Sequence, residues 1–570
     1  ESTMPYRQHI QTISLHSRNW KLSKNRWSLP TNATNSFSMP MFNGFVPERI
    51  RPWIYVCIAL SFQITGARYL GALNEIIGAT ADMREDVLMC LYCNLAGMAV
   101  WFPMLFRMKF RFTNKTLLTG ASIVVIITNW LISYVTWLPL LWLICFIEGI
   151  AKIQGTFECM SNIQLWMTPK RDMTVFFPLL HLVILAGVNS SDISSAWFAD
   201  LGDWKLMYWF VIGLHCVVLL ILTTCIHHFR FMKLPLYGID WTSLVLWSAL
   251  TMQLAYVLNY GDWYAWFNHD TVWYLTGTIL ITAFAILHRM FHVRHPYINP
   301  KVFSGFRYVK QIFILICVME CLFCTEHILE EIFLEEVMHY STIVNASLCI
   351  PVWVGNICGC LFSLWWLQKV MRMSFIRLGI IGSTVLLAYL VLMYMTMTPH
   401  INIETLYLPL FCRGFAYTTL SIVFMASLCE VMDFNHFFQG LSIFNMIHMV
   451  IGGCVGCAIY AKMLGKYVAD GFMRYTSPSL WTGKFGAGTP FDVFATGHLT
   501  DEMLLLGIKS IYGWACYACI ALILGFLLFD SPIRRHRSYM LPWRIVGEAV
   551  KKYYDVKSDG NESANNCQDC

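Results

Sequence analysis

The chain has 570 residues, of which 57% are hydrophobic and only 13% are charged. A soluble globular protein carries roughly 25% charged residues, so this composition excludes a soluble fold and indicates a protein covered mostly by lipid. The net charge of +6 says little by itself, and we expect no nucleic-acid partner. The 21 cysteines are scattered through apolar runs, as small buried hydrophobes are. We therefore expect no disulfide framework, no metal site and no cofactor.

The chain begins with a polar, basic segment at 1–50 that lacks the apolar core of a signal peptide, and we expect it to be cytoplasmic and disordered. Beyond it, apolar runs of about 20 residues recur, each long enough to cross a bilayer as a helix. They predict an all-α integral membrane protein with fourteen transmembrane helices. In chain order the predicted spans are 52–77, 87–106, 117–137, 139–167, 173–198, 204–226, 241–261, 272–292, 311–334, 343–367, 374–397, 405–431, 438–461 and 508–529.

The placement of Lys and Arg predicts the orientation of these spans. With a cytoplasmic N-terminus, the short inside loops hold sixteen Lys and Arg residues, whereas the short outside loops hold only Arg84 and Lys205. Such a bias is typical of multi-pass proteins, whose cytoplasmic loops are positively charged. We therefore expect an inner (cytoplasmic) membrane protein with both ends in the cytoplasm, including the tail at 531–570. One outside loop, 462–507, is long and Gly-rich.

Two local matches suggest that the first six and the last six spans are related by duplication. Glu75 and Glu331 lie in similar four-residue stretches, Leu-Asn-Glu-Ile and Leu-Glu-Glu-Ile. Glu148-Gly-Ile-Ala in the fourth span similarly matches Arg413-Gly-Phe-Ala in the twelfth. Duplicated bundles with a site between them are a common transporter construction. The pattern predicts a six-helix bundle at 51–230, two linker helices at 238–295, and a second six-helix bundle at 305–530.

The linker pair carries the most specific family resemblance. It runs from Gly238-Ile-Asp-Trp through Tyr260-Gly-Asp-Trp-Tyr-Ala-Trp-Phe to Arg294-His-Pro-Tyr-Ile-Asn-Pro. This layout resembles the fourteen-span branch of the major facilitator superfamily, the EmrB/QacA type of drug:proton antiporter. Three short stretches depart from that family's motifs: 105–114 lacks its Gly and Asp, Cys145 replaces an Arg, and 189–195 replaces a Gly-Pro signature. The chain therefore resembles a divergent subgroup of the branch.

Ionisable residues inside a membrane are costly and are functional candidates by default. Glu320, His327 and Glu331 are spaced to lie on one face of a straight α-helix, as a ladder from mid-membrane outward. Acid–histidine chains of this kind carry protons in transporters. Asp192 in the fifth span is a fourth proton-coupling candidate. The alternative is that the acids of the ninth span merely form an acidic outer helix end, with Glu320 paired structurally.

Four further charges are candidates for lining a cavity or for gating. Glu148 and Lys152 stand four residues apart, in the favourable order for a self-neutralising ion pair on one helix. Alternatively, Glu148 pairs across the bundle with Arg68 or Arg413, as a latch that exchanges partners during transport.

The resemblance implies proton-coupled export of amphipathic organic compounds, with substrate and protons as the small partners. It also implies a periplasmic adaptor protein and an outer-membrane channel, for which the aromatic residues of 475–495 would provide the contact. An uptake permease or facilitator on the same fold is the alternative. The sequence contains no P-loop, His-Glu-x-x-His or Gly-x-Ser-x-Gly motif, so an enzyme is not expected, and a membrane enzyme or receptor is a remote alternative.

Overall fold

The computed structural model describes residues 42–66, 70–167, 173–227, 239–306, 308–370, 375–398, 401–475 and 493–528. Within these ranges the fold is all-helical, and the isolated bridge between Phe42 and Ile226 is not part of a strand. Thirteen of the described helices are long and apolar enough to cross a membrane. The expectations for residues 1–41 and 531–570 fall outside the described residues, as does Arg68.

The N-terminal bundle is built around α6, which packs against α1, α3 and α5. The first predicted span is interrupted: α1 ends at Ile64, and Thr65 has an extended backbone before the chain resumes as η1 and α2. A helix of 14 residues is too short to cross a bilayer by itself. The bounds are α1 Arg51–Ile64, η1 Leu70–Ala72, α2 Leu73–Thr80, α3 Arg84–Trp101, η2 Phe102–Met104, α4 Leu105–Arg111, α5 Asn114–Ile132, α6 Leu138–Met167, α7 Met173–Asp200 and α8 Leu206–Cys225.

The C-terminal bundle is built around α16, which packs against α14 and α15. Its first helix continues from α12 into two π-helical segments, η4 and η5, and α17 continues into the π-helical η8. The bounds are α11 Lys301–Ser304, α12 Val309–Phe323, η4 Glu326–Glu330, η5 Phe333–Val337, α13 Thr342–Ser347, α14 Cys349–Trp365, η6 Trp366–Val370, α15 Phe375–Thr396, η7 Ile403–Leu406, α16 Tyr407–Val431, α17 Phe434–Ile447, η8 His448–Val455, α18 Gly456–Tyr475 and α20 Val493–Leu527.

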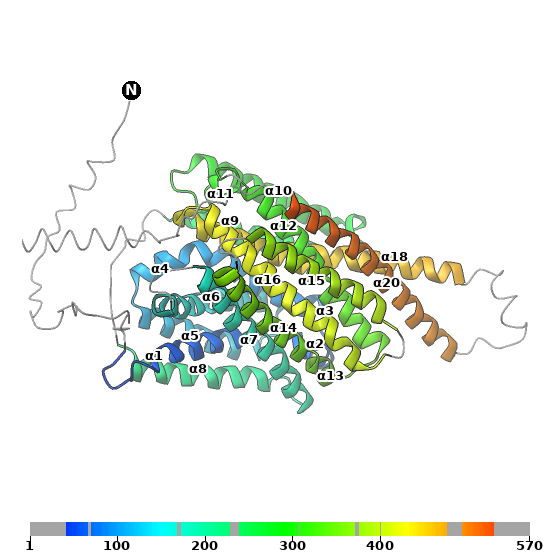
Figure 1. Ribbon diagram of the computed structural model, residues 1–570, viewed down its shortest axis with the longest axis horizontal. Helices are drawn as coiled ribbons and strands as arrows, with labels where there is room; N and C mark the ends of the chain where they lie inside the picture. The colour runs from blue at the N-terminus through cyan, green and yellow to red at the C-terminus, as the bar shows by residue number, and fades with distance from the viewer. Residues whose placement is uncertain are drawn as a thin grey trace, which may run out of the picture. The chain divides into compact units, whose positions relative to one another are not determined.

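The two bundles meet along two helix pairs, α3 with α17 and α7 with α14. Figure 1 shows the second pair, with α7 beside α14. The linker helices α9 (Trp241–Asn259) and α10 (Asp270–His292) pack on each other, with η3 (Trp266–Asn268) between them. Helix α9 also contacts α3 of one bundle and η8 of the other. The linker pair therefore touches both halves of the molecule.

Glycines at helix crossings support the duplication inferred from sequence. A Cβ atom on Gly149 would lie 2.0 Å from the carbonyl oxygen of Asn94, and one on Gly414 would lie 2.2 Å from that of Val352. Gly149 follows Glu148 and Gly414 follows Arg413, so the two close approaches occur at matching positions of α6 and α16. Small residues allow helix backbones to pack this closely in membranes.

The region expected to be an outer loop at 462–507 is largely helical, which corrects that prediction. Helix α18 continues to Tyr475, and α20 begins at Val493. The two helices pack together, and both extend beyond the predicted spans 438–461 and 508–529 (Figure 1). The Trp514 indole donates to the Tyr467 hydroxyl at 2.8 Å, and Gly507 packs against Leu464. Hydropathy alone misses these turns because charged residues interrupt the apolar pattern, among them Lys462, Lys466, Asp470, Asp501 and Glu502. Residues 476–492, the middle of the expected adaptor contact, lie outside the described residues.

Candidate functional site

Glu320 and His448 form a carboxylate–imidazole pair that bridges α12 and η8. The Oε2 atom of Glu320 lies 2.8 Å from Nδ1 of His448. Only 3% of the Glu320 side chain is exposed, against 37% for His448. Imidazole titrates close to neutral pH, so a proton can pass between an accessible ring and a buried carboxylate. The sequence analysis identified Glu320 as a candidate but missed its partner.

Arg413 on α16 binds two acids of the π-helical segment η4. Its guanidinium contacts Glu330, and its Nη2 lies 3.1 Å from Oε1 of Glu326. The Tyr389 hydroxyl donates to the other oxygen of Glu330. Arg413 is thus neutralised within its own bundle, by Glu326 and Glu330 and not by Glu148. The latch that exchanges partners during transport stays a prediction.

Glu148 and Lys152 are both buried in α6, and they bond to different neighbours. The side-chain amide of Asn129 donates to Glu148 Oε1 at 2.7 Å, while Lys152 Nζ donates to the carbonyl oxygen of Thr65 at 2.6 Å. The direct ion pair favoured by their spacing is absent from the part of the chain that the structure describes. The Lys152 ammonium lies at the C-terminus of α1, where helix-end carbonyls favour a cation.

Charged residues of the two bundles come within electrostatic range of each other where α7 meets the C-terminal bundle. Asp192 on α7 interacts with Lys152 of its own bundle and with Glu326 of the opposite bundle. His327 interacts with Glu326, Arg413 and Glu320. The structure therefore gathers six of the eight residues predicted from sequence into one cluster of interacting charges, which we call the charged centre: Glu148, Lys152, Asp192, Glu320, His327 and Arg413.

Glu331 leaves the charged centre and pairs with Arg84 at the start of α3, at 2.6 Å. The straight-helix ladder of Glu320, His327 and Glu331 therefore does not form. The physical reason is that η4 is π-helical, and its wider turn changes the direction of the side chains that follow, including that of Glu331.

Comparison with known proteins rests on solved structures alone, because no protein-family model and no curated protein matches the chain. A crystal structure of a mutant of the nucleoside transporter NupG aligns with 84% of this chain and 99% of its own, at a TM-score of 0.50 and 14% identity. The human organic anion transporter MFSD10 aligns with 84% of this chain and 100% of its own, at a TM-score of 0.50 and 8% identity. The chain has the major facilitator fold. At these identities the likeness concerns the fold alone.

The two halves of this major facilitator fold are in contact at both ends of α3. At the end where α3 begins, Arg84 binds Glu331. Halfway along the helix, the Tyr92 hydroxyl donates to the Gly453 carbonyl at 2.7 Å. At the opposite end, the Ser442 hydroxyl donates to the Ala99 carbonyl at 2.8 Å. The two bundles are thus joined at three positions along α3.

An aromatic cluster adds to the contact between the bundles near the C-terminal end of α3. The charge pattern of the sequence predicts that this end faces the cytoplasm. The rings of Phe106 and Phe438, from opposite bundles, are edge-to-face with centroids 4.2 Å apart. Phe157 of α6 packs on both rings. Beside it, Lys109 pairs with buried Glu158 at 3.1 Å. The aromatic rings thus join the two bundles here, whereas the Lys109–Glu158 pair lies within the N-terminal bundle.

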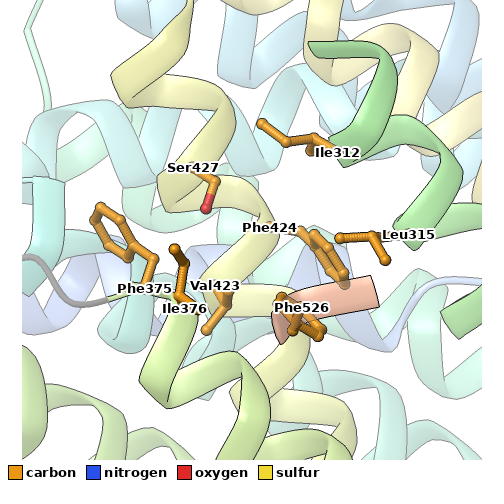
Figure 2. Close-up of a pocket in the computed structure, with 8 residues that line it drawn as sticks. All are labelled: Ile312, Leu315, Phe375, Ile376, Val423, Phe424, Ser427 and Phe526. Atoms are coloured by element: carbon orange, nitrogen blue, oxygen red, sulfur yellow. The ribbon is translucent and has the colours of Figure 1, made fainter. Parts of the chain in front are cut away.

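A small pocket in the C-terminal bundle lies apart from the charged centre. Figure 2 shows Leu315, Phe424 and Phe526 close together on its wall, and Ser427 provides the one polar side chain. Its lining comes from α12, α15, α16 and α20, all of one bundle, and contains none of the ionisable candidates. We therefore assign the candidate site to the charged centre and not to this pocket.

Three members of the charged centre are not among the site candidates predicted from sequence: His448, Glu326 and Glu330. From sequence, Glu326 and Glu330 belong to an acidic outer helix end. An apolar run predicts where a helix lies, but it does not predict which residue of a distant helix will be its partner. The signal available for His448 was its position within an apolar span, which marks any titratable residue as a candidate.

Proposed function

We propose that this chain is a secondary active transporter that couples the movement of an organic substrate to protons through Glu320 and His448. The observation that carries the proposal is their contact: a buried carboxylate bonded to a partly exposed imidazole, on two helices of the same bundle. A second observation is that the pair adjoins a π-helical segment at its His448 end. Such segments occur often at functional sites.

The coupling follows from the cost of buried charge. When Glu320 is ionised, protonated His448 neutralises it, and the pair keeps the two helices together. Transfer of the His448 proton to Glu320 leaves both groups neutral, and the pair can then separate without leaving an unpaired charge. Gly452 packs against the Glu320 carboxylate, so a change in the pair acts directly on the backbone of η8.

We propose export of amphipathic organic compounds, as in the fourteen-span drug:proton antiporters that the linker helices resemble. In that assignment the chain lies in the inner membrane with both ends cytoplasmic, and an adaptor and an outer-membrane channel receive the substrate. Uptake by a permease uses the same fold and the same coupling pair. The direction of the proton gradient that drives accumulation distinguishes the two.

The test compares two modes of transport in proteoliposomes. Glu320→Gln keeps the size of the side chain and removes its titration, so gradient-driven accumulation should be lost. Exchange of labelled for unlabelled substrate without a gradient should persist, because exchange requires no net protonation cycle. Glu336→Gln is the matched control, since Glu336 is an exposed acid on the same helix. Unchanged gradient-driven accumulation in Glu320→Gln would rule out Glu320 and make Asp192 the leading candidate.

A further inference from the structure

Arg413 holds two carboxylates that differ in how firmly they are fixed. Only 6% of the Glu330 side chain is exposed, whereas 40% of the Glu326 side chain is exposed. Both acids lie in η4, at its first and last residues. The guanidinium therefore presents one nitrogen to a deeply buried acid and another to an acid that solvent can reach.

The buried acid has additional support. The Tyr389 hydroxyl donates to Glu330, and Tyr389 is itself fully buried, with the Tyr512 hydroxyl 3.4 Å away. Glu330 thus holds Arg413 in place from one side. The second nitrogen, Nη2, remains charged and oriented even if Glu326 moves away.

The surroundings of Glu326 favour its departure. Asp192 approaches from the opposite bundle, and two ionised carboxylates repel each other. Glu326 also interacts electrostatically with groups on its own segment and on four other elements: Arg413 and Tyr417 on α16, Asp192 on α7, Cys349 on α14, His448 on η8, and His327 and Glu330 on η4 itself. Only Arg413 is a permanent cation among these groups.

We propose that Nη2 of Arg413 is the recognition site for an organic carboxylate, and that Glu326 occupies this site when no substrate is bound. The inference rests on the proposed transport function and adds the substrate class. Arginine is well suited to binding carboxylates because its planar guanidinium offers fixed, charge-assisted donors. An incoming carboxylate displaces Glu326, and the released Glu326 takes one proton from solution. One anion and one proton are then bound together, so the total charge of the site does not change.

The probes are three naphthalene compounds of similar shape and different charge: 2-naphthoate, 2-naphthamide and 2-naphthylmethylammonium. Their binding to the purified full-length protein is measured by fluorescence titration at several pH values near neutrality. The wild type should bind 2-naphthoate in preference to the other two. While Glu326 is ionised in the unbound protein, the affinity for 2-naphthoate should fall roughly tenfold for each unit rise in pH, because binding takes up one proton.

Glu326→Gln is the decisive variant. The neutral amide competes more weakly for Arg413 than a carboxylate does, so 2-naphthoate should bind roughly tenfold more tightly at neutral pH. The pH dependence of binding should disappear in the same variant. Glu336→Gln should bind 2-naphthoate as the wild type does, because Glu336 is an exposed acid outside the site. Substitution of Arg413 is avoided, since it would leave Glu330 buried without its cation.

Two results would overturn the anion site: preference of the wild type for the ammonium compound, or unchanged affinity for 2-naphthoate in Glu326→Gln. Failure of the proposed transport function gives a different result. In that case Glu326→Gln still strengthens 2-naphthoate binding, but no compound moves protons across proteoliposomes of the wild type.

Discussion

Arg84 and Glu331 form an ion pair of 2.6 Å between the first residue of α3 and the helix that carries η4 and η5. It joins the two bundles at the end that the charge pattern assigns to the outside. The linker region also binds the first turn of α3: the Asn259 amide donates to the Glu85 carbonyl at 2.6 Å, and the Tyr260 hydroxyl donates to Asp86. The start of α3 is therefore held from both sides.

Removing this ion pair should open the expected outer side more often. The side chains are 34% and 24% exposed, and a partly exposed pair contributes only about 0.2–1 kcal/mol. Arg84→Gln should therefore raise the labelling of Cys349 by an impermeant thiol reagent roughly 1.5- to 5-fold. Cys349 is a native reporter, because it interacts with Arg413 and Glu326 at the charged centre. Labelling is read from the Cys349 peptide by mass spectrometry.

The charge-swapped double variant Arg84→Glu with Glu331→Arg is the control for this prediction. It restores the attraction and should return labelling to the wild-type level. If Cys349 is labelled equally in the single and the double variant, the Arg84–Glu331 ion pair does not hold the two bundles together.

The glycine crossings predict a selective sensitivity to one added methyl group. Gly149→Ala and Gly414→Ala place a Cβ atom against a backbone carbonyl and should each destabilise the purified protein by about 1–3 kcal/mol. Gly120→Ala is the matched control, since nothing lies within 4 Å of its Cβ position. In a helix interior, this change should be stabilising by about 0.5–1 kcal/mol. Melting temperatures in detergent test this prediction: those of Gly149→Ala and Gly414→Ala should lie below that of Gly120→Ala. Equal melting temperatures for all three variants would contradict the close helix crossings.

Asp240 should contribute stability that is lost in acid. It caps α9 by accepting the Ser243 amide at 3.1 Å, and it pairs with Arg289 of α10 at 2.6 Å. Burial alone would raise the pKa of Asp240, but the hydrogen bonds from Arg289 and Ser243 outweigh it, and the pKa is lowered. The stabilisation is therefore complete above the unfolded value of about 4 and is lost as the pH falls through the lower folded pKa.

Two substitutions separate the roles of Asp240. Asp240→Asn keeps a capping oxygen and removes the charge, whereas Asp240→Ala removes both and should cost about 1 kcal/mol more. Melting of the wild type and Asp240→Asn should converge as the pH is lowered. A constant difference between them at all pH values would show that the charge has no part in the stabilisation.

The sequence analysis succeeded where a local pattern decides the structure. Runs such as 374–397 and 405–431 agree closely with α15 and α16, because the length of an apolar run directly limits the helix it can form. It failed where geometry depends on distant partners. A fixed angle per residue does not predict the direction of Glu331, because Glu331 follows a π-helical segment. The helical ends of α18 and α20 depend on their contact with each other.

The orientation of the chain is tested by epitope tags. A tag after Cys570 should be protected from antibody in intact cells, because the positive-inside pattern assigns the C-terminus to the cytoplasm. A tag inserted near Gly488 should be accessible from outside, and permeabilised cells provide the control for antibody binding. Finding both tags on the same side would contradict the fourteen-span arrangement.

Substrate-dependent proton movement in proteoliposomes of the wild-type protein tests the central claim most directly. A pH-sensitive dye inside the vesicles reports protons while each of the three naphthalene compounds is added in turn. We predict that at least one compound drives proton movement in the wild type and in Glu336→Gln, and that the movement is absent in Glu320→Gln. Transport of a compound by the wild type with no accompanying proton movement would contradict proton coupling through Glu320 and His448.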